Sequence, residues 1–259
     1  MIKFTIITCT YNAAKVVGRT LDSLRRQTYP HVEHLILDGK SSDSTLQLAR
    51  AYQAESEEAE TDHEIVIVSE PDSGLYDAMN KGIGMATGDY LLFLNAGDVL
   101  PSEDTLELVA DSVGDGEQLP GVLYGYTDIV DSAGRFLRHR RLEPPQEGLS
   151  WRSFSSGMLV CHQAFYARTD LAKRTLYDLH YRFSADVDWC IRVMKLCEQE
   201  NLPLKNIGMT VVNYLDGGLT TKNHRASLKE RFRVMCHHYG LPLTLWKHLT
   251  FVFRAIVKK

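Results

Sequence analysis

Short apolar runs alternate with helix-like patterns along the first part of the chain. The apolar runs have the length of strands, and each is followed by a polar turn; they lie at residues 4–9, 34–37 and 65–68. Between them, apolar positions at helical spacing predict helices over residues 16–24 and 45–53. Strands that alternate with helices indicate an α/β protein with a mainly parallel sheet, right-handed crossovers and helices on both faces.

A further apolar run, at residues 90–94, continues without a break into the polar turn Asn95-Ala-Gly-Asp98. A continuous apolar run is typical of a strand that is covered on both faces, and ligands of open α/β sheets bind beyond the carboxyl ends of such strands. Asp98 is therefore placed like a residue of a binding site. The alternative is an ordinary turn before a helix that begins near residue 102, since Asn, Gly and Asp are common turn residues.

The second half of the chain continues this alternation, and no repeat, low-complexity block or linker divides it. The pattern predicts a helix at 105–113, a strand at 122–126 and a hairpin at 128–141 with its turn at 131–134. It then predicts a second helix that begins in the block 183–192 and a late strand at 210–214. A glycine-containing loop follows at 216–224. We expect a main domain over residues 1–225 and a helical C-terminal extension over residues 226–259.

The composition is that of an ordinary soluble globular protein. Of the 259 residues, 44% are hydrophobic and 24% are charged, which is enough for one sizeable core. The formal net charge of −4 gives no general attraction for nucleic acid, so an anionic ligand has to be held by local groups. We therefore expect no nucleic-acid partner.

Cysteine usage and the N-terminus bear on the compartment. The five cysteines are odd in number and form no CxxC pair, which argues against a disulfide framework or a zinc site and favours a reducing cytoplasm. The first residues enter a strand at once and lack the layout of a secretory signal. No stretch of about 18 apolar residues occurs, so no membrane-spanning helix is expected.

The most specific polar block in the chain covers residues 69–82. It contains three acids, an amide, a lysine and two glycines between two predicted strands. If a helix begins near Leu75, Asp77 and Lys81 lie one turn apart on its surface. A capped amphipathic helix with an Asp77–Lys81 surface pair explains the helix but not the density of acids before it. The polar residues of this block therefore lie next to the ends of the predicted strands.

Together these motifs resemble the inverting, nucleotide-sugar-dependent glycosyltransferases of family 2, from Phe4 to about Thr221. Residues 8–12 are similar to the opening strand-end motif of the family, and residues 37–45 are similar to its Asp-Gly-x-Ser-x-Asp-x-Thr signature. Residues 70–82 are close to the form found in polysaccharide-assembly members. The resemblance implies a GT-A fold, which is a Rossmann-like sheet, and an enzyme with a nucleoside-diphosphate sugar donor. It also implies a saccharide or lipid-linked saccharide acceptor.

The resemblance assigns the first two motifs to the nucleotide end of the donor. It implies that Thr10, Tyr11 and Asn12 belong to the nucleotide-sugar site, with Thr10 and Tyr11 lining the nucleobase pocket. Asp38 would accept a hydrogen bond from an N–H on the edge of the base. The alternative for Asp38 is a cap for the turn that follows it.

Further residues would border the ribose, the diphosphate and the sugar. The resemblance places Asp72, Asn80 and Lys81 at the ribose and diphosphate, where Lys81 supplies a positive charge. The alternative for Lys81 is a solvent-facing helix residue. His162 ends a stretch that resembles the family's approach to a His-Gln pair, so it would lie near the sugar; a structural histidine is the alternative.

The turn at residues 95–98 corresponds to the metal motif of the family. That motif is commonly Asp-x-Asp-Asp, so Asp98 occupies its last acidic position while two usual carboxylates are absent. A divalent cation, Mg²⁺ or Mn²⁺, favours oxygen ligands and can be completed by diphosphate oxygens and water. The resemblance therefore implies a cation held by Asp98, and Asn95 would contact the ribose or the ion through its amide oxygen.

The block that begins at Phe183 supplies the candidate catalytic base. In the family this position contains Glu-Asp-x-Asp, and the aspartate that aligns with Asp186 acts as general base on the acceptor hydroxyl. Here Ala185 replaces the preceding Glu. We expect Asp188 to be a structural partner of Arg192 one helical turn away, and the alternative is the reverse assignment, with Asp188 as the base.

The thinned metal motif and Ala185 leave a second interpretation open, a sugar-nucleotide-binding protein without turnover. A Rossmann-type dehydrogenase or methyltransferase is disfavoured because no G-x-G-x-x-G follows the first strand. In the family, loops like residues 216–224 close over the diphosphate, where Thr220, Lys222 or His224 would contact phosphate or metal; a mobile surface loop is the alternative.

The tail, residues 241–259, combines large apolar side chains with Lys, Arg and His, and it is too short and too basic to span a membrane. A helix of this kind can lie on an anionic membrane surface, which would place the enzyme at the inner face of the cytoplasmic membrane. A packing or dimerisation helix is the alternative, and the oligomeric state stays open.

Overall fold

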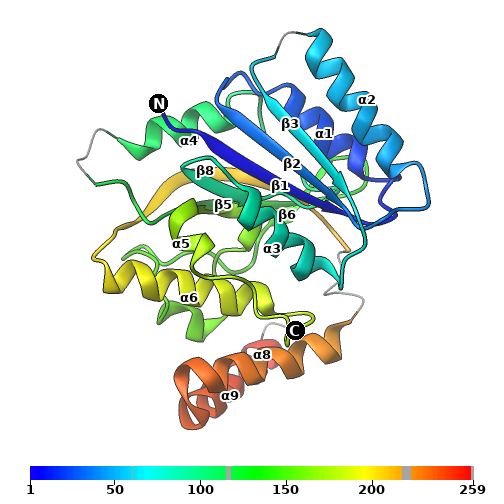
Figure 1. Ribbon diagram of the computed structural model, residues 1–259. Coiled ribbons are helices and arrows are strands. Elements are labelled where there is room, and N and C mark those ends of the chain that lie inside the picture. Colours follow the sequence, from blue (N-terminus) through cyan, green and yellow to red (C-terminus); the bar gives the residue numbers. More distant parts are fainter. Residues whose placement is uncertain (60, 115–117, 218–222, 258–259) are drawn as a thin grey trace.

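The computed structural model describes residues 1–59, 61–114, 118–217 and 223–257, and eight strands within these ranges form one mixed sheet (Figure 1). The strands are β1 Phe4–Thr10, β2 Val32–Asp38, β3 Glu64–Ser69, β4 Tyr90–Phe93, β5 Val122–Val130, β6 Phe136–His139, β7 Phe165–Arg168 and β8 Leu204–Leu215. Their order is β3-β2-β1-β4-β7-β5-β6, and β8 pairs with β5. The strands β1 to β4 run parallel to one another, and β8 runs parallel to β5. The strand β7 pairs antiparallel with both β4 and β5, and β6 pairs antiparallel with β5.

Helices cover both faces of this sheet, as the alternating pattern predicts. They are α1 Val17–Arg25, α2 Thr45–Glu58, α3 Leu75–Met85, α4 Thr105–Val113, α5 Thr169–Lys173, α6 Ala185–Gln199, α8 His224–Tyr239 and α9 Leu241–Val257, with short 3₁₀ turns η1 Ser153–Ser156 and η2 His162–Ala164. Side chains of β2 alternate between two cores: Leu35 and Leu37 join the main core, and Ile36 packs in a smaller one with α1 and α2. Successive residues of a strand point to opposite faces, which explains the division.

The parallel register brings the polar strand ends together at one edge of the sheet. Thr10 pairs with Asp38, and Asp38 pairs with Ser69, so the ends of β1, β2 and β3 form a row. On the other side of β1, Ile7 pairs with Phe93, and the chain leaves β4 into the turn at residues 95–98. The sequence segments chosen as candidate site residues therefore meet at this edge.

Some elements differ from the sequence-based prediction. The strand β7 and the helix α5 were not predicted: β7 is short and ends in the charged Arg168, and the five residues of α5 are too few to establish a helical period. The strand β8 begins at Leu204, before the predicted range 210–214, since its first half is polar and partly exposed. The hairpin is confirmed: β5 and β6 pair antiparallel, and the Gly134 N–H donates to the Asp131 carbonyl over 2.9 Å.

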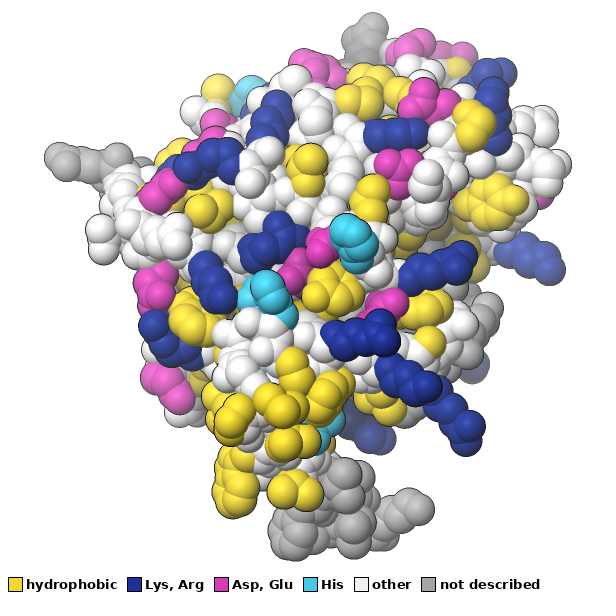
Figure 2. Space-filling view, turned by 60° about the horizontal axis from the view of Figure 1, so that its bottom comes forward, with side chains coloured by type: hydrophobic (Ala, Val, Ile, Leu, Met, Phe, Trp, Pro, Cys, Tyr) yellow, Lys and Arg dark blue, Asp and Glu magenta, His cyan; other side chains and the backbone are white. Residues whose placement is uncertain are grey.

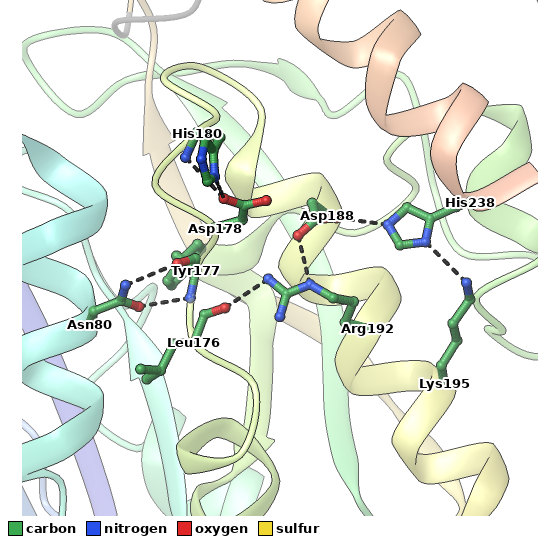
Figure 3. Close-up of polar contacts among 9 residues, drawn as sticks. All are labelled: Asn80, Leu176, Tyr177, Asp178, His180, Asp188, Arg192, Lys195 and His238. Carbon is green, nitrogen blue, oxygen red and sulfur yellow. Dashed lines mark hydrogen bonds and ion pairs between the residues drawn. The ribbon is translucent and has the colours of Figure 1, made fainter.

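The helix α8 packs against α6 through a buried polar network (Figure 3). Asp188 accepts a hydrogen bond from Arg192 Nε at 2.7 Å, which confirms the expected one-turn pair, and a second from His238 Nε2 at 2.8 Å. The other ring nitrogen of His238 lies 3.0 Å from Lys195 Nζ. A buried carboxylate with two such partners is stabilised in its charged form, and the pKa of Asp188 is lowered because these partners outweigh burial.

The C-terminal helices lie together at one end of the molecule, next to α6 (Figure 1). Within the residues that the structure describes, no helix has both the length and the apolar character needed to cross a membrane.

Two glycines, Gly88 and Gly84, allow a matched test of how closely the backbone before β4 packs against β1. A Cβ on buried Gly88 would lie 2.6 Å from the Lys3 carbonyl oxygen and 2.8 Å from the Thr5 nitrogen, whereas a Cβ on exposed Gly84 would meet nothing within 4 Å. We expect Gly88→Ala to lower the free energy of unfolding by about 2 kcal/mol or more, because backbone atoms cannot move aside. Gly84→Ala is expected to raise it by up to about 1 kcal/mol through helix propensity.

Urea unfolding followed by circular dichroism measures both values. Equal effects of the two substitutions would contradict the close approach of Gly88 to β1.

Candidate active site

A cavity of about 450 Å³ opens at the strand ends. Its walls come from the end of β1, the start of α3, the turn after β4, η2, the start of α6, the end of β8 and α8. Five of the sequence-predicted site residues line it: Tyr11, Asn95, Asp98, His162 and Asp186. The fold therefore brings together residues that are up to 175 positions apart in the chain, and we take this cavity as the candidate active site.

Asp186 lies in the first turn of α6 and faces the cavity. Its side chain is 19% exposed; Oδ1 accepts a hydrogen bond from the Tyr76 hydroxyl at 3.4 Å, and Oδ2 lies 3.5 Å from His162 Nδ1. Burial pushes the pKa of Asp186 upward, but its interaction with His162 and the charge of Arg231 outweigh burial and hold the pKa below the ordinary value. Asp186 is thus an ionised acceptor at the cavity wall.

Asn95 and His162 form a direct contact beside this carboxylate. Asn95 Nδ2 lies 3.2 Å from His162 Nε2, and the buried imidazole packs edge-on against Phe93. The other amide atom, Asn95 Oδ1, is buried and has no hydrogen-bond partner within the described part of the chain. A buried carbonyl oxygen without a partner is costly, so this atom is a candidate contact for a ligand.

Asp98 is almost fully buried at the other side of the same turn. Its Oδ1 accepts the Leu215 N–H at 2.9 Å, and its Oδ2 accepts a hydrogen bond from Gln163 Nε2 at 3.2 Å. Burial raises the pKa of this carboxyl to about 7, although both hydrogen bonds oppose the rise. Asp98 is therefore a carboxyl group that exchanges its proton close to neutral pH.

The backbone of this turn disfavours a carboxylate at position 97 of the motif. Gly97 has a φ of +103°, and a Cβ there would lie 2.6 Å from the Leu215 side chain. Glycine is the residue that adopts this conformation without strain. Among the residues described, no group of three or more His, Cys, Asp or Glu side chains is arranged to hold a metal ion.

A carboxylate has about four lone-pair positions, so Asp98 retains two after its hydrogen bonds. Together with the free Oδ1 of Asn95, these oxygens suit a hard cation whose remaining ligands come from elsewhere.

The end of β1 and the turn after β2 form a hydrogen-bonded support for Tyr11. Asp38 accepts hydrogen bonds from Thr10 Oγ1 at 3.1 Å and Ser69 Oγ at 2.7 Å, and it also accepts from the backbone and hydroxyl of Ser41. These bonds lower the pKa of Asp38, although burial, the largest single effect, raises it. The contacts of Asp38 therefore agree with the alternative in which it caps the turn that follows it. Its contact with a nucleobase stays a prediction.

Asn12 and Asp72 flank the same support. Asn12 Oδ1 accepts the Ser42 N–H at 2.8 Å, and the residue has a left-handed φ of 49°. A Cβ on Gly39 would lie 2.4 Å from Asp72 Oδ2 and 3.5 Å from the Tyr11 ring, so Asp72 and Tyr11 both border the bare backbone at Gly39. The Tyr11 side chain is 68% exposed, which leaves its ring free to stack on a planar ligand.

Asn80 and Lys81 lie outside the cavity lining. The Asn80 amide is fully paired with the backbone of Tyr177, with Nδ2 to the carbonyl at 3.0 Å and Oδ1 to the N–H at 2.7 Å (Figure 3). Lys81 pairs with Glu70 at 2.8 Å and lies 3.8 Å from Asp77. Their assignment to ribose and diphosphate stays a prediction; the contacts described hold the loop around Tyr177 and the start of α3.

The structure adds cavity residues that the sequence did not identify, among them Arg182 and Arg231. Arg231 comes from α8, where the family resemblance no longer guided the prediction, and a single arginine in a polar helix carries no recognisable signal. Its Nε is buried and has no hydrogen-bond partner within the described residues. The cavity therefore has a cationic wall beside Asp186.

The neighbouring Glu230 holds the start of α6. Its carboxylate accepts the backbone N–H groups of Arg182 at 3.0 Å, Phe183 at 2.6 Å and Ser184 at 3.2 Å. These N–H groups belong to the segment that leads into α6 and to its N-cap, Ser184, and a carboxylate beside a helix N-terminus is also favoured by the helix dipole. A carboxylate from α8 thus lies at the helix start where Ala185 replaces the family's Glu.

Thr220 and Lys222 fall outside the described residues, as does the side chain of His224. Their predicted contacts with phosphate or metal stay predictions.

Solved structures identify the class of fold. TarS 1-349 of S. aureus in complex with UDP-GlcNAc is similar with a TM-score of 0.69 and 18% identity, over 90% of this chain and 64% of that chain. The mannosyltransferase PcManGT from Pyrobaculum calidifontis, in complex with GDP-Man and Mn²⁺, is similar with a TM-score of 0.61 and 17% identity, over 95% of this chain and 74% of that chain. The fold is therefore the GT-A fold of nucleotide-sugar glycosyltransferases.

Sequence comparison identifies the family. The family model described as Glycosyl transferase family 2 matches residues 5–175. A PGL/p-HBAD biosynthesis glycosyltransferase of Mycobacterium bovis is 37% identical over 190 residues, which are 73% of this chain and 68% of that protein. The amylovoran biosynthesis glycosyltransferase AmsB of Erwinia amylovora is 30% identical over 203 residues, 75% of this chain and 65% of that protein. The chain belongs to glycosyl transferase family 2, as its motifs indicated, and it is a glycosyltransferase.

Asp98 predicts a pH dependence of stability in the metal-free protein. Because burial raises its pKa from 3.8 to about 7, the folded state binds this proton more tightly than the unfolded state. The protonated carboxyl stabilises the fold fully below pH 3.8, and this contribution is lost as the pH rises to about 7. The full difference is about 4 kcal/mol.

Asp98→Asn removes the charge and can still pair with Leu215 and with a turned Gln163 amide. We expect the variant to be more stable than the parent protein by about 4 kcal/mol at pH 8 and by only about 1.5 kcal/mol at pH 5, where most of the contribution of the protonated carboxyl is still present. Urea unfolding in EDTA at both pH values measures this change. A stability difference that is the same at pH 5 and pH 8 would rule out the raised pKa.

Proposed function

We propose that the protein is an inverting glycosyltransferase that moves a sugar from a nucleoside-diphosphate sugar to a hydroxyl of a saccharide or lipid-linked saccharide. The observation that carries this proposal is the ionised Asp186 carboxylate, which shares one cavity with Asn95 and Asp98 at the strand ends. Relatives named for amylovoran and PGL/p-HBAD biosynthesis support a role in assembling a cell-surface polysaccharide or glycolipid.

The donor would lie along the edge of the sheet. Its base stacks on Tyr11, beside the bare backbone at Gly39 and the carboxylate of Asp72. Its ribose or diphosphate meets Asn95 Oδ1 and Asp98 further into the cavity. The complex of TarS with UDP-GlcNAc supports a nucleotide sugar as the ligand class.

A divalent cation, Mg²⁺ or Mn²⁺, would be held by Asp98 and Asn95 Oδ1, with the diphosphate as its main ligand. PcManGT has been solved with Mn²⁺, which supports this assignment. When bound, such a cation neutralises the charge that develops on the leaving nucleoside diphosphate. The carboxyl of Asp98 must be ionised for this role, so cation binding is expected to weaken below its pKa of about 7.

Asp186 would act as the general base. Its carboxylate accepts the proton of the acceptor hydroxyl while that oxygen bonds to the anomeric carbon and the bond from that carbon to the diphosphate oxygen breaks. Attack from the side opposite the leaving group inverts the configuration. Tyr76 and His162 hold the carboxylate, and Arg182 and Arg231 give the acceptor end of the cavity its positive charge.

A protein that binds a sugar nucleotide without turnover is the second candidate. The single carboxylate of the metal motif and Ala185 favour it. Diphosphate release distinguishes the two functions directly. The test incubates the protein with UDP-, GDP- and dTDP-sugars and Mn²⁺, with and without saccharide and lipid-linked acceptors, and measures the nucleoside diphosphate that forms. Binding of a donor without release under any acceptor would favour the second candidate, and activity that survives EDTA would remove the cation.

Replacement of the base separates chemistry from donor binding. We expect Asp186→Asn to lower transfer at least about a hundredfold, because the amide cannot accept the proton, while donor affinity measured by calorimetry changes less than about threefold. Asp22→Asn, at an exposed carboxylate of α1 outside the cavity, serves as the matched control. Full activity of Asp186→Asn would overturn the assignment of the base.

We also propose that the C-terminal helices hold the enzyme on an anionic membrane surface at the cytoplasmic side. Leu241, Leu245 and Leu249 recur on one side of α9 and are exposed, and Trp246, 63% exposed, lies next to them. Figure 2 shows hydrophobic side chains gathered toward the lower end of the molecule, near Lys and Arg side chains. On α8, the exposed cations lie four residues apart, at Arg225, Lys229 and Arg233. Apolar and cationic faces side by side suit an anionic lipid surface.

Cosedimentation with vesicles tests this surface. The parent protein is expected to bind vesicles that contain phosphatidylglycerol and not neutral ones. Substituting Leu245, Trp246 and Leu249 together by Ser should weaken binding more than about tenfold, because each buried side chain contributes roughly 1.5–3 kcal/mol. Leu108→Ser with Leu137→Ser, at exposed apolar positions of α4 and β6, is the matched control.

Unchanged vesicle binding of the triple variant would exclude the membrane surface. A dimer in light scattering that only this variant loses would instead assign α9 to self-association.

We propose, finally, that the chain up to Tyr239 acts as one unit. The predicted boundary at residues 225 and 226 would separate Glu230 and Arg231 from the cavity that they support. This leaves α9 as the extension.

A further inference from the structure

The contact between Asn95 and His162 has a fixed polarity. Asn95 Nδ2 lies 3.2 Å from His162 Nε2, and an amide nitrogen can only donate. With the amide in this orientation, His162 Nε2 presents a lone pair, which places a proton of the ring on Nδ1. The group that Nδ1 faces is Asp186 Oδ2, at 3.5 Å.

The part of the chain that the structure describes offers no other hydrogen-bond partner for that proton. His162 is buried and packs edge-on against Phe93, and its Nδ1 makes no hydrogen bond within the described residues. A distance of 3.5 Å is slightly longer than a hydrogen bond, and contacts of catalytic groups are often long before substrate binds. A small approach of the two groups completes the bond.

The identity of residue 95 decides this polarity. A carboxylate, which the family commonly has at this position, could only accept, and it would place a proton on Nε2. The amide reverses the hydrogen bond and leaves Oδ1 buried without a hydrogen-bond partner among the described residues. The asparagine at position 95 therefore does more than remove a charge from the metal motif, because it also sets the direction of the hydrogen bond to His162.

The next residue couples this arrangement to Asp98. His162 and Gln163 are consecutive in η2; the first faces Asp186, and the second donates to Asp98 Oδ2 at 3.2 Å. One short turn therefore sets the positions of both carboxyl groups of the cavity.

We propose that Asn95 fixes His162 in the tautomer with its proton on Nδ1, which makes His162 a positioning residue for the carboxylate of Asp186. The hydrogen-bond polarity rests on the orientation of the Asn95 amide and on the Asp186 carboxylate that faces Nδ1, whereas its meaning for catalysis rests on the proposed function. His162 holds the plane of the carboxylate, and the remaining lone pairs of Asp186 face the acceptor hydroxyl.

Nitrogen NMR of protein labelled with ¹⁵N-histidine tests the tautomer without any substrate. The signals of His162 are identified by their loss in His162→Gln. At pH 8, Nδ1 is expected to have the shift and coupling of a protonated ring nitrogen, and Nε2 those of an unprotonated one. In Asn95→Asp, Nε2 should become protonated, while the signals of the histidines outside the cavity serve as internal controls.

A protonated Nε2 in the parent protein would overturn the proposal, and so would identical His162 signals in Asn95→Asp. Transfer kinetics test the positioning role separately. His162→Leu is expected to lower kcat by about a hundredfold, with little change in the KM of the donor, because the base loses its orientation. His162→Gln keeps a donor and an acceptor in the ring's place and should recover at least about tenfold of that loss.

Equal kcat values for the Leu and Gln variants would reject the positioning role. The absence of transfer by the parent protein would reject the proposed function, while the NMR result would still decide the tautomer.

Discussion

The parallel pairing of β1 with β2 on one side and with β4 on the other is the constraint on which the rest of the structure depends. Parallel strands end at a common edge of the sheet, so the polar segments that follow them meet although they are distant in the sequence. Tyr11, Gly39 and the turn at residues 95–98 reach one region in this way. The elements from the second half of the chain, η2, the start of α6 and α8, close the cavity against that edge.

Much of the fold could be predicted because its central strands are long apolar runs. The strands at residues 4–9 and 90–94 lie in apolar runs that are followed by polar turns, whereas β7 is short and ends in the charged Arg168. The site was predictable as far as motifs reach, to Asp98 and Asp186. It was not predictable for Arg231, since a single charge on a polar helix has no pattern that distinguishes a cavity from solvent.

Residues within the same motifs divide into two physical roles that sequence cannot separate. Asp38 and Asn80 have every polar atom engaged by neighbouring chain, and Asn80 bonds to a backbone 97 positions away. Asn95 keeps a free oxygen, and Asp98 keeps unused lone pairs in a cavity. Whether a polar atom is free depends on long-range packing, and local sequence contains little information about it. The raised pKa of Asp98 and the lowered pKa of Asp186 follow from the same packing.

The contact of Glu230 with the segment that leads into α6 has a consequence for exchanging parts between relatives. Because Glu230 binds the N–H groups of Phe183 and Ser184, and His238 binds Asp188, α8 and α6 form one mechanical unit. A chimaera joined near residue 225 would combine Asp186, the proposed base, with a foreign α8. Any change in acceptor preference obtained that way would be mixed with a change in the orientation of Asp186. A joint before β7 keeps Asp186, its support from α8 and the cationic wall from one parent.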